Sequence, residues 1–290
     1  MKVKALTGAI IQARTASTRL PAKILKNLPY GSGVSVLEQV IRRLKRAASL
    51  DRIIVATTEN PEDDAIVELA RKENVPYFRG PEKDVLARYY QAAKENGLEV
   101  IVRVTSDCPC IDPEVVDLVV KDISESGADY ASNSLKRTYP HGLDTEVFTM
   151  AALERSFKEA KKKFEREHVT PYIYMTGQFQ IRNVEVPEEF FAPEIRITLD
   201  TMEDYALLCA VYDYLYPGNP LFGVSEIVKL FKVKPWLKFI NGKVVQKKIF
   251  GGLTEELEET VKILDLQDLK RARDFIRERI ADFNEGRTAP

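Results

Sequence analysis

The chain alternates between short β-branched segments and amphipathic segments over its first 130 residues. Short apolar runs bounded by glycine or polar loops predict buried strands, and apolar residues spaced three and four apart predict the helices between them. The predicted strands are 7–13, 52–57, 75–79 and 100–105, and the predicted helices are 35–48, 62–74, 84–96 and a fourth that starts at Pro113. This alternation predicts an α/β fold with a mainly parallel sheet and helices on both faces.

The pattern changes after residue 130. The turn-rich stretch PHGLD separates two short predicted strands, and a charged helix and a further strand follow it; these elements are 130–134, 145–149, 151–163 and 182–186. We expect about 135–190 to form an inserted lid or dimerisation segment. A buried strand over 195–199 and a helix over 203–214 return to the earlier pattern, and 255–283 predicts a charged helix or helix pair. The expected organisation is one domain over 1–248 and a helical C-terminal tail of unknown role over 249–290.

Charge is balanced in total but unevenly distributed. The chain has 43 Lys and Arg against 44 Asp and Glu, yet its first 37 residues carry six cations and no acid. A near-neutral total without a basic, aromatic-studded face disfavours nucleic-acid binding. No apolar run approaches the roughly 18–20 residues that a membrane helix needs. Three cysteines are too few for a disulfide framework, which favours a reducing, cytoplasmic setting.

The loop after the first predicted strand concentrates cations and hydroxyls. Its sequence, QARTASTRLPAK, places Arg14, Arg19 and Lys23 among small residues, at the edge where parallel sheets bind ligands. Arginine forks, a mobile lysine and exposed backbone N–H groups are the parts that a polyphosphate needs. Neither GxxxxGK[ST] nor GxGxxG is present, and a solvated basic loop is the alternative.

Carboxylates follow two other predicted strands. Asp107 lies two residues beyond the strand 100–105, in a stretch with four acids and no base, and Asp200 follows 195–199. Two carboxylates facing a polyphosphate are a common way to hold Mg²⁺. Asp112 is better explained as the N-cap before Pro113, whereas Asp200 suits a metal ligand, a capping box with Glu203, or both at once.

Together these segments resemble a known family. IIQARTASTRLPAKIL resembles the N-terminal signature of the sugar nucleotidylyltransferases that make CMP-activated acidic sugars, including the CMP-KDO and CMP-sialate synthetases. The chain is most similar to the SpsF-type cytidylyltransferases of spore coat polysaccharide biosynthesis, through ATTENPEDDAIVELA, FRGPEKDVLARYYQAAK, VRVTSDCPCIDPE, GADYASN, GLDTEVF, EREHVTPYIY and LDTMEDY. The resemblance runs over about 7–235 and implies a glycosyltransferase-A-like nucleotide-binding fold.

The resemblance also implies roles for individual residues. Those expected to bind CTP are Ala13, Arg14, Ser17, Arg19, Lys23, Thr57, Thr58, Arg79, Asp84, Thr105 and Ser106. Arg14 and Lys23 are expected to stabilise charge at the α-phosphorus and on the departing pyrophosphate. Asp107 and Asp200 are expected to hold Mg²⁺, so that these four residues form the catalytic set. Those expected to face a sugar-like acceptor are Asp144, Glu146 and His168.

The sequence leaves several alternatives open. Ser106 stands where family members commonly have Gly, and His141 where they commonly have Asp, so base and acceptor selectivity could differ. The product could be CMP-linked or CDP-linked, and no general base is identified. A nucleotide-sugar-dependent glycosyltransferase and a non-catalytic nucleotide-binding protein on the same fold are the alternative functions. Related enzymes imply a homodimer formed through 135–190, and Cys108 and Cys110 are expected to be packing residues.

Overall fold

The computed structural model describes residues 5–244 and 253–284. The chain divides into two compact units, Met1–Val244 and Val245–Pro290. The boundary expected at residue 248 lies outside the described residues. The first unit contains the sheet and the predicted ligand-binding edge, and it is described first.

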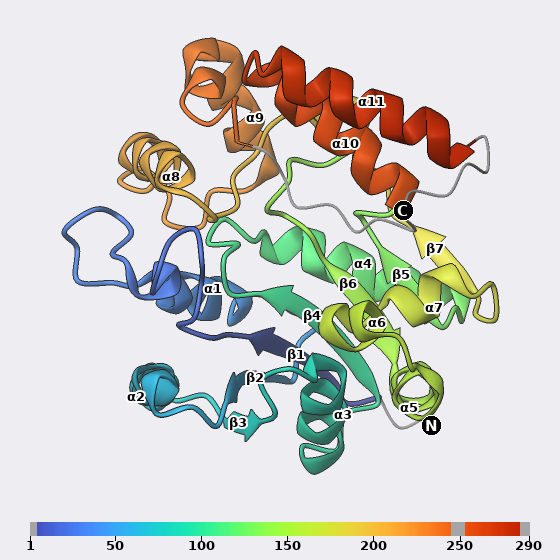
Figure 1. Ribbon diagram of the computed structural model, residues 1–290. Coiled ribbons are helices and arrows are strands. Elements are labelled where there is room, and N and C mark those ends of the chain that lie inside the picture. The colour runs from blue at the N-terminus through green and yellow to red at the C-terminus, as the bar shows by residue number, and fades with distance from the viewer. Residues whose placement is uncertain (1–4, 245–252, 285–290) are drawn as a thin grey trace. The chain divides into compact units, whose positions relative to one another are not determined.

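A single mixed sheet forms the centre of the first unit (Figure 1). Its strands follow the order β3-β2-β1-β4-β6-β5-β7, and their bounds are β1 Thr7–Gln12, β2 Arg52–Thr58, β3 Tyr77–Gly80, β4 Val100–Thr105, β5 Tyr130–Ser132, β6 Glu146–Thr149 and β7 Ile181–Asn183. The first four strands are parallel, and β6 is antiparallel to both β4 and β5. Gln12 pairs with Ala56 on one side and Thr105 on the other, so the carboxyl ends of β1, β2 and β4 are level.

Helices cover both faces of this sheet. They are α1 Val36–Leu44, α2 Asp64–Lys72, α3 Val85–Glu95, α4 Pro113–Ser126, α5 Met150–Glu159, α6 Lys163–His168, α7 Pro171–Met175, α8 Met202–Leu215 and α9 Val224–Val233. Apolar residues of α1, α2 and α4 form one buried cluster with the sheet, and those of α3, α5 and α7 form another on the opposite face. Short 3₁₀ helices occur at η1 Lys23–Leu25, η2 Pro61–Asp63, η3 Glu188–Phe190 and η4 Pro235–Phe239.

The helix starts follow from local hydrogen bonding. Ser35 and Glu38 form a capping box at α1, since the Glu38 N–H donates to Ser35 Oγ at 3.2 Å and the Ser35 N–H donates to Glu38 Oε2 at 2.7 Å. Asp112 caps α4 as predicted, accepting from the Glu114 N–H at 2.9 Å, with Pro113 at the first helical position. These caps begin each helix at the carboxyl edge of the sheet.

A third apolar cluster joins α8 and α9 to the sheet edge. It contains residues from the segment 186–237 and also from the loop after β1, such as Leu20 and Leu28. The buried guanidinium of Arg43 on α1 donates to the carbonyls of Ile111, Pro220 and Phe222, which ties α9's preceding loop to the main domain. The segment between β7 and α9 is thereby fixed against the loops that follow β1 and β4.

One prediction about the second half of the unit was wrong. Residues 195–199 do not form a strand, because the structure gives them a single isolated β-bridge, between Arg196 and His141. Ile195, Ile197 and Leu199 are nonetheless buried, so the alternating pattern reports an extended segment packed by its side chains. Within 135–190, β6 and β7 belong to the sheet, and a role of this segment as a lid or dimerisation element stays a prediction. Helices α6, α7 and α9 were not predicted.

The second unit contains a helix pair, α10 Leu253–Leu266 and α11 Lys270–Asn284. The turn between them places Asp268 at a positive φ of 54°. Among the described residues, no helix is both long enough and apolar enough to cross a membrane.

Candidate active site

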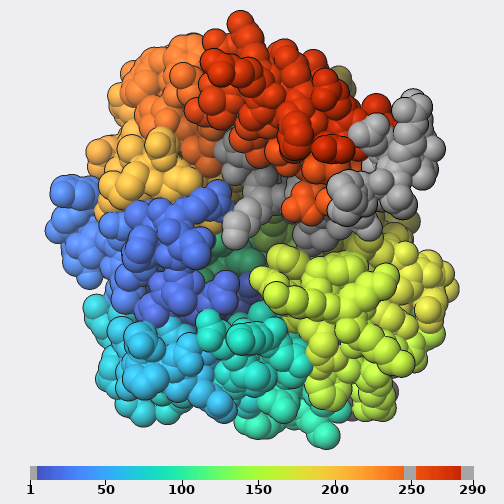
Figure 2. All heavy atoms as spheres, viewed as in Figure 1, coloured from blue at the N-terminus to red at the C-terminus, as the bar shows by residue number. Residues whose placement is uncertain are grey.

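The parallel strands define where a ligand site belongs. The chain runs from β1 outward through β2 and β3, then returns to place β4 on the other side of β1. A crevice outside the carboxyl ends of β1 and β4 results from such a change of direction. On the face shown in Figure 2 the molecule is hollowed between the N-terminal segment (blue) and the segment near residue 165 (yellow-green).

Lys23 and two carboxylates meet at this crevice. Lys23 Nζ lies 2.6 Å from Asp107 Oδ2 and 2.9 Å from Asp200 Oδ1. The Lys23 side chain is 13% exposed, and both carboxylate side chains are 22% exposed. Burial lowers the pKa of Lys23, but the two carboxylates raise it above its ordinary value overall. The ammonium group is therefore charged and bridges Asp107 and Asp200, which are 93 residues apart in the sequence.

Asp200 is surrounded by cations. Besides Lys23, Arg19 Nη2 lies 3.0 Å and Arg196 Nη2 2.8 Å from Asp200 Oδ2. Burial raises the pKa of Asp200, but Lys23, then Arg196 and Arg19, hold it far below its ordinary value. Arg196 also pairs with buried Asp204 at 2.9 Å. The sequence did not identify Arg196 or Asp204, because nothing local marks either residue.

The capping role considered for Asp200 was wrong. The N-cap of α8 is Thr201, and its capping-box partner is Asp204 and not Glu203. Asp204 Oδ2 also accepts from the Asp200 N–H at 2.9 Å, so α8 positions Asp200 without using its side chain. The Asp200 carboxylate takes no part in the helix cap and is available in the crevice. Asp107 is fixed similarly, since its carbonyl accepts from the Leu199 N–H at 2.9 Å.

The loop after β1 has a defined backbone. Ala22, just before Lys23, has φ 51° and ψ 31°, a left-handed conformation that is uncommon for a residue with a side chain. Its N–H donates to the Thr15 carbonyl at 3.1 Å, which closes the loop. Such strained positions persist only where the surroundings enforce them. Here the enforced turn points Lys23 at the two carboxylates.

Asp63 is a residue beside the candidate site that the sequence analysis missed. Its Oδ1 accepts from both the N–H and the Oγ1 of Thr15, each at 2.7 Å, and its Oδ2 accepts from Thr58 Oγ1. Asp63 is 2% exposed. Burial raises its pKa, but the hydrogen bonds from Thr58 and Thr15 lower it overall. Asp63 therefore joins the loop after β1 to the loop after β2. The sequence feature that could have indicated Asp63 is an acidic residue at the start of a helix.

The other predicted nucleotide-binding residues occupy varied positions. Ala13 is buried and its N–H donates to the Ala56 carbonyl at 3.0 Å, whereas Arg14 is half exposed, with Nη1 3.8 Å from Glu82 Oε1. Ser17 is partly exposed in the same loop. Thr105 contacts the Cys108 sulfur, and Ser106 is buried, at the end of β4.

Two predicted pocket residues have structural partners. The Arg79 guanidinium donates to the carbonyls of Thr58 and Asn60 at 2.8 and 2.7 Å, which fixes the loop after β2. Asp84 caps α3 through the Ala87 N–H and pairs with Arg166 of α6 at 2.7 Å. Their nucleotide-binding roles remain predictions. Thr57 is fully buried at the end of β2, and its hydroxyl has no hydrogen-bond partner among the described residues.

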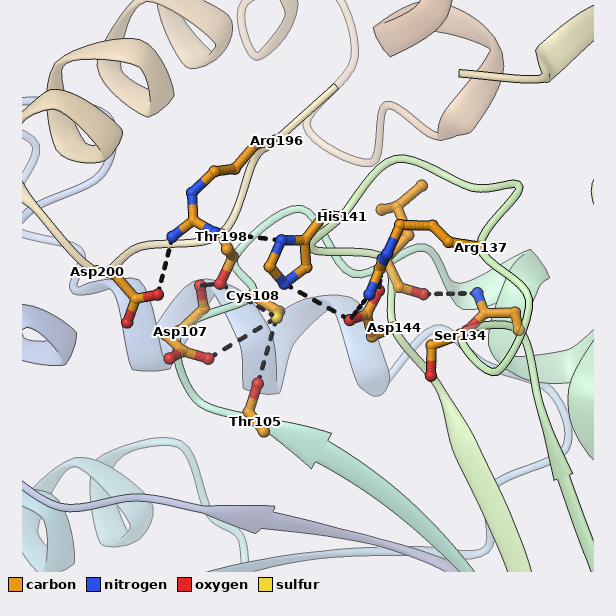
Figure 3. A network of polar contacts seen from close by, with 12 residues as sticks. Thr105, Asp107, Cys108, Ser134, Arg137, His141, Asp144, Arg196, Thr198 and Asp200 are labelled. Carbon is orange, nitrogen blue, oxygen red and sulfur yellow. Dashed lines mark hydrogen bonds and ion pairs between the residues drawn. The ribbon is translucent and has the colours of Figure 1, made fainter. Parts of the chain in front are cut away.

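A second polar cluster lies beside Asp107 and Asp200 (Figure 3). Arg137 makes paired hydrogen bonds of 2.6 and 3.0 Å to Asp144, and His141 Nε2 lies 3.7 Å from Asp144 Oδ2. On the other side of the ring, His141 Nδ1 lies 3.2 Å from Arg196 Nη1. An arginine only donates, so Nδ1 is the acceptor and the His141 proton is on Nε2. Burial lowers the pKa of His141, which favours this neutral form.

The turn that presents His141 depends on a glycine. Gly142 has φ 117°, and a Cβ atom there would lie 2.7 Å from the backbone of Ile197. The backbone of 141–142 therefore packs directly against the extended segment 195–199. The His141 N–H donates to the Ile195 carbonyl at 2.8 Å, and the Ile197 N–H donates to the His141 carbonyl at 2.7 Å. This contact places Asp144 and Asp200 on one side of the crevice.

Two of the predicted acceptor-facing residues lie outside this cluster. Glu146 pairs with Arg103 and accepts from Tyr130 Oη at 2.7 Å and Thr170 Oγ1 at 2.6 Å, inside a buried network under β4 and β6. His168 is partly exposed at the end of α6. The structure thus brings Asp144 close to the metal-binding candidates but gives Glu146 partners of its own.

The carboxylates can accommodate a cation. Asp107 and Asp200 already converge on one positive group, the Lys23 ammonium, through one oxygen each. Mg²⁺ takes one or two carboxylates and completes its shell with water and phosphate oxygens. In the described parts of the chain no three His, Cys, Asp or Glu residues form a metal-binding group. The site therefore suits a cation that arrives with a phosphate ligand.

The cysteines near the crevice are packing residues. Cys108 and Cys110 are buried, and burial raises the pKa of the Cys108 thiol well above its ordinary value and that of Cys110 to about 12. Neither forms a thiolate near neutral pH, so neither is a nucleophile. The site has carboxylates, cations and a neutral histidine, which are groups that bind and stabilise charge.

A switch-point crevice in a parallel sheet, a cation-rich loop after β1 and two facing carboxylates define a nucleotide-binding α/β enzyme of the nucleotidyltransferase class. The comparisons with known proteins identify it further. The cytidylyltransferase family profile matches residues 8–232, and the chain belongs to this family. The resemblance seen in the sequence is thereby confirmed, together with the fold class that it implied.

Relatives and solved structures agree with this assignment. The chain is 42% identical to the uncharacterized protein MJ1063 of Methanocaldococcus jannaschii over 82% of this chain and 95% of that protein. It is 34% identical to the spore coat polysaccharide biosynthesis protein SpsF of Bacillus subtilis, over 78% of this chain and 94% of SpsF.

Among solved structures, a cytidylyltransferase from Leptospira borgpetersenii superposes with a TM-score of 0.75 at 32% identity, covering 85% of this chain and 99% of that one. A CMP:2-keto-3-deoxy-manno-octonic acid synthetase complexed with CTP has a TM-score of 0.56 at 15% identity, over 72% and 99% of the two chains, and shows the shared fold alone.

Proposed function

We propose that this cytidylyltransferase transfers CMP from CTP to an acidic or phosphorylated sugar-like acceptor and releases pyrophosphate. The observation that carries the proposal is the position of Lys23, between Asp107 and Asp200 at the β1–β4 crevice. A triphosphate needs mobile cations for its oxygens and carboxylates for its metal. In this crevice the two kinds of group lie within hydrogen-bonding distance of each other. The names of SpsF and of the CTP-complexed synthetase support cytidine and sugar as the substrate classes.

The chain's own residues would act on charge. Lys23, Arg14 and Arg19 bind the triphosphate oxygens and stabilise the negative charge that grows as the acceptor attacks the α-phosphorus in line. Asp107 and Asp200 would hold Mg²⁺, which supplies further neutralisation of phosphate charge when it is bound. With the two carboxylates holding the metal, Lys23 would donate to the phosphate oxygens. The bond from the α-phosphorus to the bridging oxygen breaks, and pyrophosphate leaves.

The cluster beside the carboxylates would bind the acceptor. Asp144 and neutral His141 present one acceptor and one donor group, which suit sugar hydroxyls, and Arg137 and Arg196 provide positive charge for a carboxylate or phosphate. SpsF is named for polysaccharide biosynthesis, and this supports a surface polysaccharide or glycoconjugate as the destination of the product. A free hydroxyl would give a CMP-sugar and a phosphate a CDP-linked product.

Pyrophosphate release tests the proposal. We expect release only with CTP, Mg²⁺ and an acceptor from a panel of acidic and phosphorylated sugars. Asp107→Asn, Asp200→Asn and Lys23→Met should each lower kcat at least about a hundredfold, since each removes charge stabilisation from the transition state. Lys121→Met, an exposed change on α4, is the control and should keep normal turnover.

Other results would favour the alternatives. Glycosyl transfer from a nucleotide-sugar would identify a glycosyltransferase, and nucleotide binding without turnover under any condition would identify a non-catalytic binding protein. The combined presence of Lys23, Asp107 and Asp200 favours the enzyme. A protein that only binds a nucleotide does not require residues that stabilise a departing pyrophosphate.

We also propose a homodimer that uses parts of 135–190 and a cytoplasmic location. The free thiols of all three cysteines support a reducing compartment. Sedimentation that gives a monomer mass at micromolar concentration would contradict the dimer.

A further inference from the structure

Gln12 presents an unpaired amide nitrogen at the end of the central strand. Its Oε1 accepts from Arg103 Nη2 at 3.2 Å, and because an arginine only donates, the oxygen is the amide atom that faces Arg103. The amide nitrogen Nε2 has no hydrogen-bond partner among the described residues. Across the same residues, the unpaired polar atoms that are sealed from solvent belong to Thr57, Arg88 and Arg103. Gln12 is only partly buried, so its Nε2 is accessible to solvent and to a ligand.

The strand arrangement decides from which side Nε2 can be reached. β1 has β4 and β2 as neighbours, and Gln12 is its last residue, level with Thr105 and Ala56. Alternate side chains of a strand share a face, so Gln12 is on the same face as Ile10, which packs with α3, α5 and α7. Because helices cover that face, a ligand approaches Nε2 from the carboxyl edge of the sheet, where the crevice lies.

A buried ion pair fixes the orientation of the amide. Arg103 pairs with Glu146 through Nη1, and the two side chains are 14% and 10% exposed. Glu146 also accepts from Tyr130 Oη at 2.7 Å and from Thr170 Oγ1 at 2.6 Å, so donors from three segments hold its carboxylate. A guanidinium is a rigid fork, so fixing Nη1 on Glu146 also fixes the Nη2 that binds Gln12. The amide is therefore oriented before a ligand binds, which lowers the entropic cost of binding.

The neighbours of Gln12 in the chain indicate the nucleotide and not the acceptor. Gln12 directly precedes Ala13 and Arg14, which begin the loop proposed to bind the triphosphate. The proposed acceptor cluster comes from other segments, 137–144 and Arg196. CTP presents oxygen acceptors at its phosphates, its ribose and its base, and an amide N–H is a donor that suits any of them.

We propose that Gln12 donates through Nε2 to an oxygen of bound CTP, and that Arg103, fixed by Glu146, is the positioning residue that orients this donor. Glu146, which the sequence resemblance assigned to the acceptor, then acts on the nucleotide through two other side chains. The inference rests on the proposed use of CTP. A solvated amide that only satisfies Arg103 is the alternative.

Calorimetric affinities test the contact. With Mg²⁺, wild type and Gln12→Met are compared for CTP, CMP and inorganic tripolyphosphate. We expect Gln12→Met to bind CTP about tenfold more weakly, because it lacks the donor. A parallel loss for tripolyphosphate would place the oxygen on the triphosphate, and a loss for CMP alone would place it on the CMP half of the nucleotide. Both results would support the contact.

Gln178→Met is the matched control. Gln178 Oε1 also accepts from an arginine, Arg155, but it does so at an exposed position beyond α7. The control variant therefore loses the same kind of contact at a different place, and every affinity should stay at the wild-type value.

A double-mutant cycle tests the positioning role. Arg103→Lys keeps a positive charge beside Glu146 but loses the fork that reaches Gln12, so it should weaken CTP binding. In a chain that already carries Gln12→Met, the same change should have no further effect, because Arg103 acts through the amide. Tyr130→Phe removes one donor from Glu146 without changing a charge, and it should show a smaller loss that disappears in the same way. Melting curves without ligand identify the variants that fold.

Other outcomes would overturn the inference. Unchanged CTP affinity in Gln12→Met would overturn the contact and leave the proposed function intact. Additive losses in the double variants would overturn the positioning role, since Arg103 would then act on the fold and not through Gln12. Wild-type protein that does not bind CTP would count against the proposed function itself, whatever the variants do.

Discussion

At the scale of single residues, the site is organised by charges that local sequence does not explain. Asp200 faces Lys23, Arg19 and Arg196, and the last of these also touches His141 and Asp204. Lys23 and the two carboxylates were predicted because their residue types suit a triphosphate. Arg196 was not, since its partners come from the turn at 141 and the start of α8. A pairing of this kind exists only once the chain is folded.

His141 gives the site a dependence on pH. Its folded pKa is lowered, whereas the unfolded chain has the ordinary value of about 6.5. Below that value the unfolded state binds more protons than the folded state, so stability falls as the pH is lowered. Protonation also puts a second donor against Arg196.

We therefore expect wild-type protein to lose more thermal stability between pH 7 and pH 5 than His141→Gln, whose amide oxygen still accepts from Arg196. Melting curves across this range provide the measurement. Parallel curves for the two proteins would show that His141 does not couple protonation to folding.

At the scale of elements, the loops of the site are held by contacts between neighbouring βα units. Asp63, at the end of η2, joins the loop after β1 to the end of β2, and its Thr15 partner is 48 residues away. Arg79 fixes the same region from β3. The loop after β1 therefore depends on β2 and β3 for its shape.

Asp63→Ala should lower the free energy of unfolding by about 2–3 kcal/mol, because three donors in a buried site lose a charged acceptor. Urea unfolding measures the effect. Asp64→Ala is the matched control on the adjacent residue: its carboxylate is exposed and pairs with Arg79, so we expect a change within about 0.5 kcal/mol. Equal effects of the two substitutions would contradict a special role for Asp63.

The element pattern was predictable where periodicity and packing agree. Strands and helices up to residue 126 match the structure because each βα unit buries one face against the sheet. The prediction of a strand over 195–199 was wrong because alternating apolar residues indicate only that one side of a segment is buried. A β-strand also needs a neighbouring strand to pair with. That segment packs against Gly142 and offers a single bridge.

At the scale of the whole molecule, the first unit has a complete core. Among the described residues, the buried members of its three apolar clusters all lie between Ala9 and Leu237. The family match ends at residue 232, before the second unit begins. The helices α10 and α11 expose large apolar residues such as Leu266 and Phe275. The first unit is therefore expected to fold without them.

A chain ending at Val244 should melt within about 4 °C of the full protein, which for a unit of this size corresponds to about 1 kcal/mol. It should also retain its affinity for CTP. Differential scanning calorimetry and titration of both proteins provide the comparison. A fall of more than about 10 °C would show that the core depends on the C-terminal helices.

Periodicity and residue chemistry are local properties, so the sequence was enough to predict the α/β class and to single out the cation-rich loop and the two carboxylates. Which groups meet depends on the folded chain. Folding placed Lys23 between Asp107 and Asp200 and gave Glu146 buried partners of its own. Each of these outcomes depends on distances between segments far apart in the chain, which no local pattern reports.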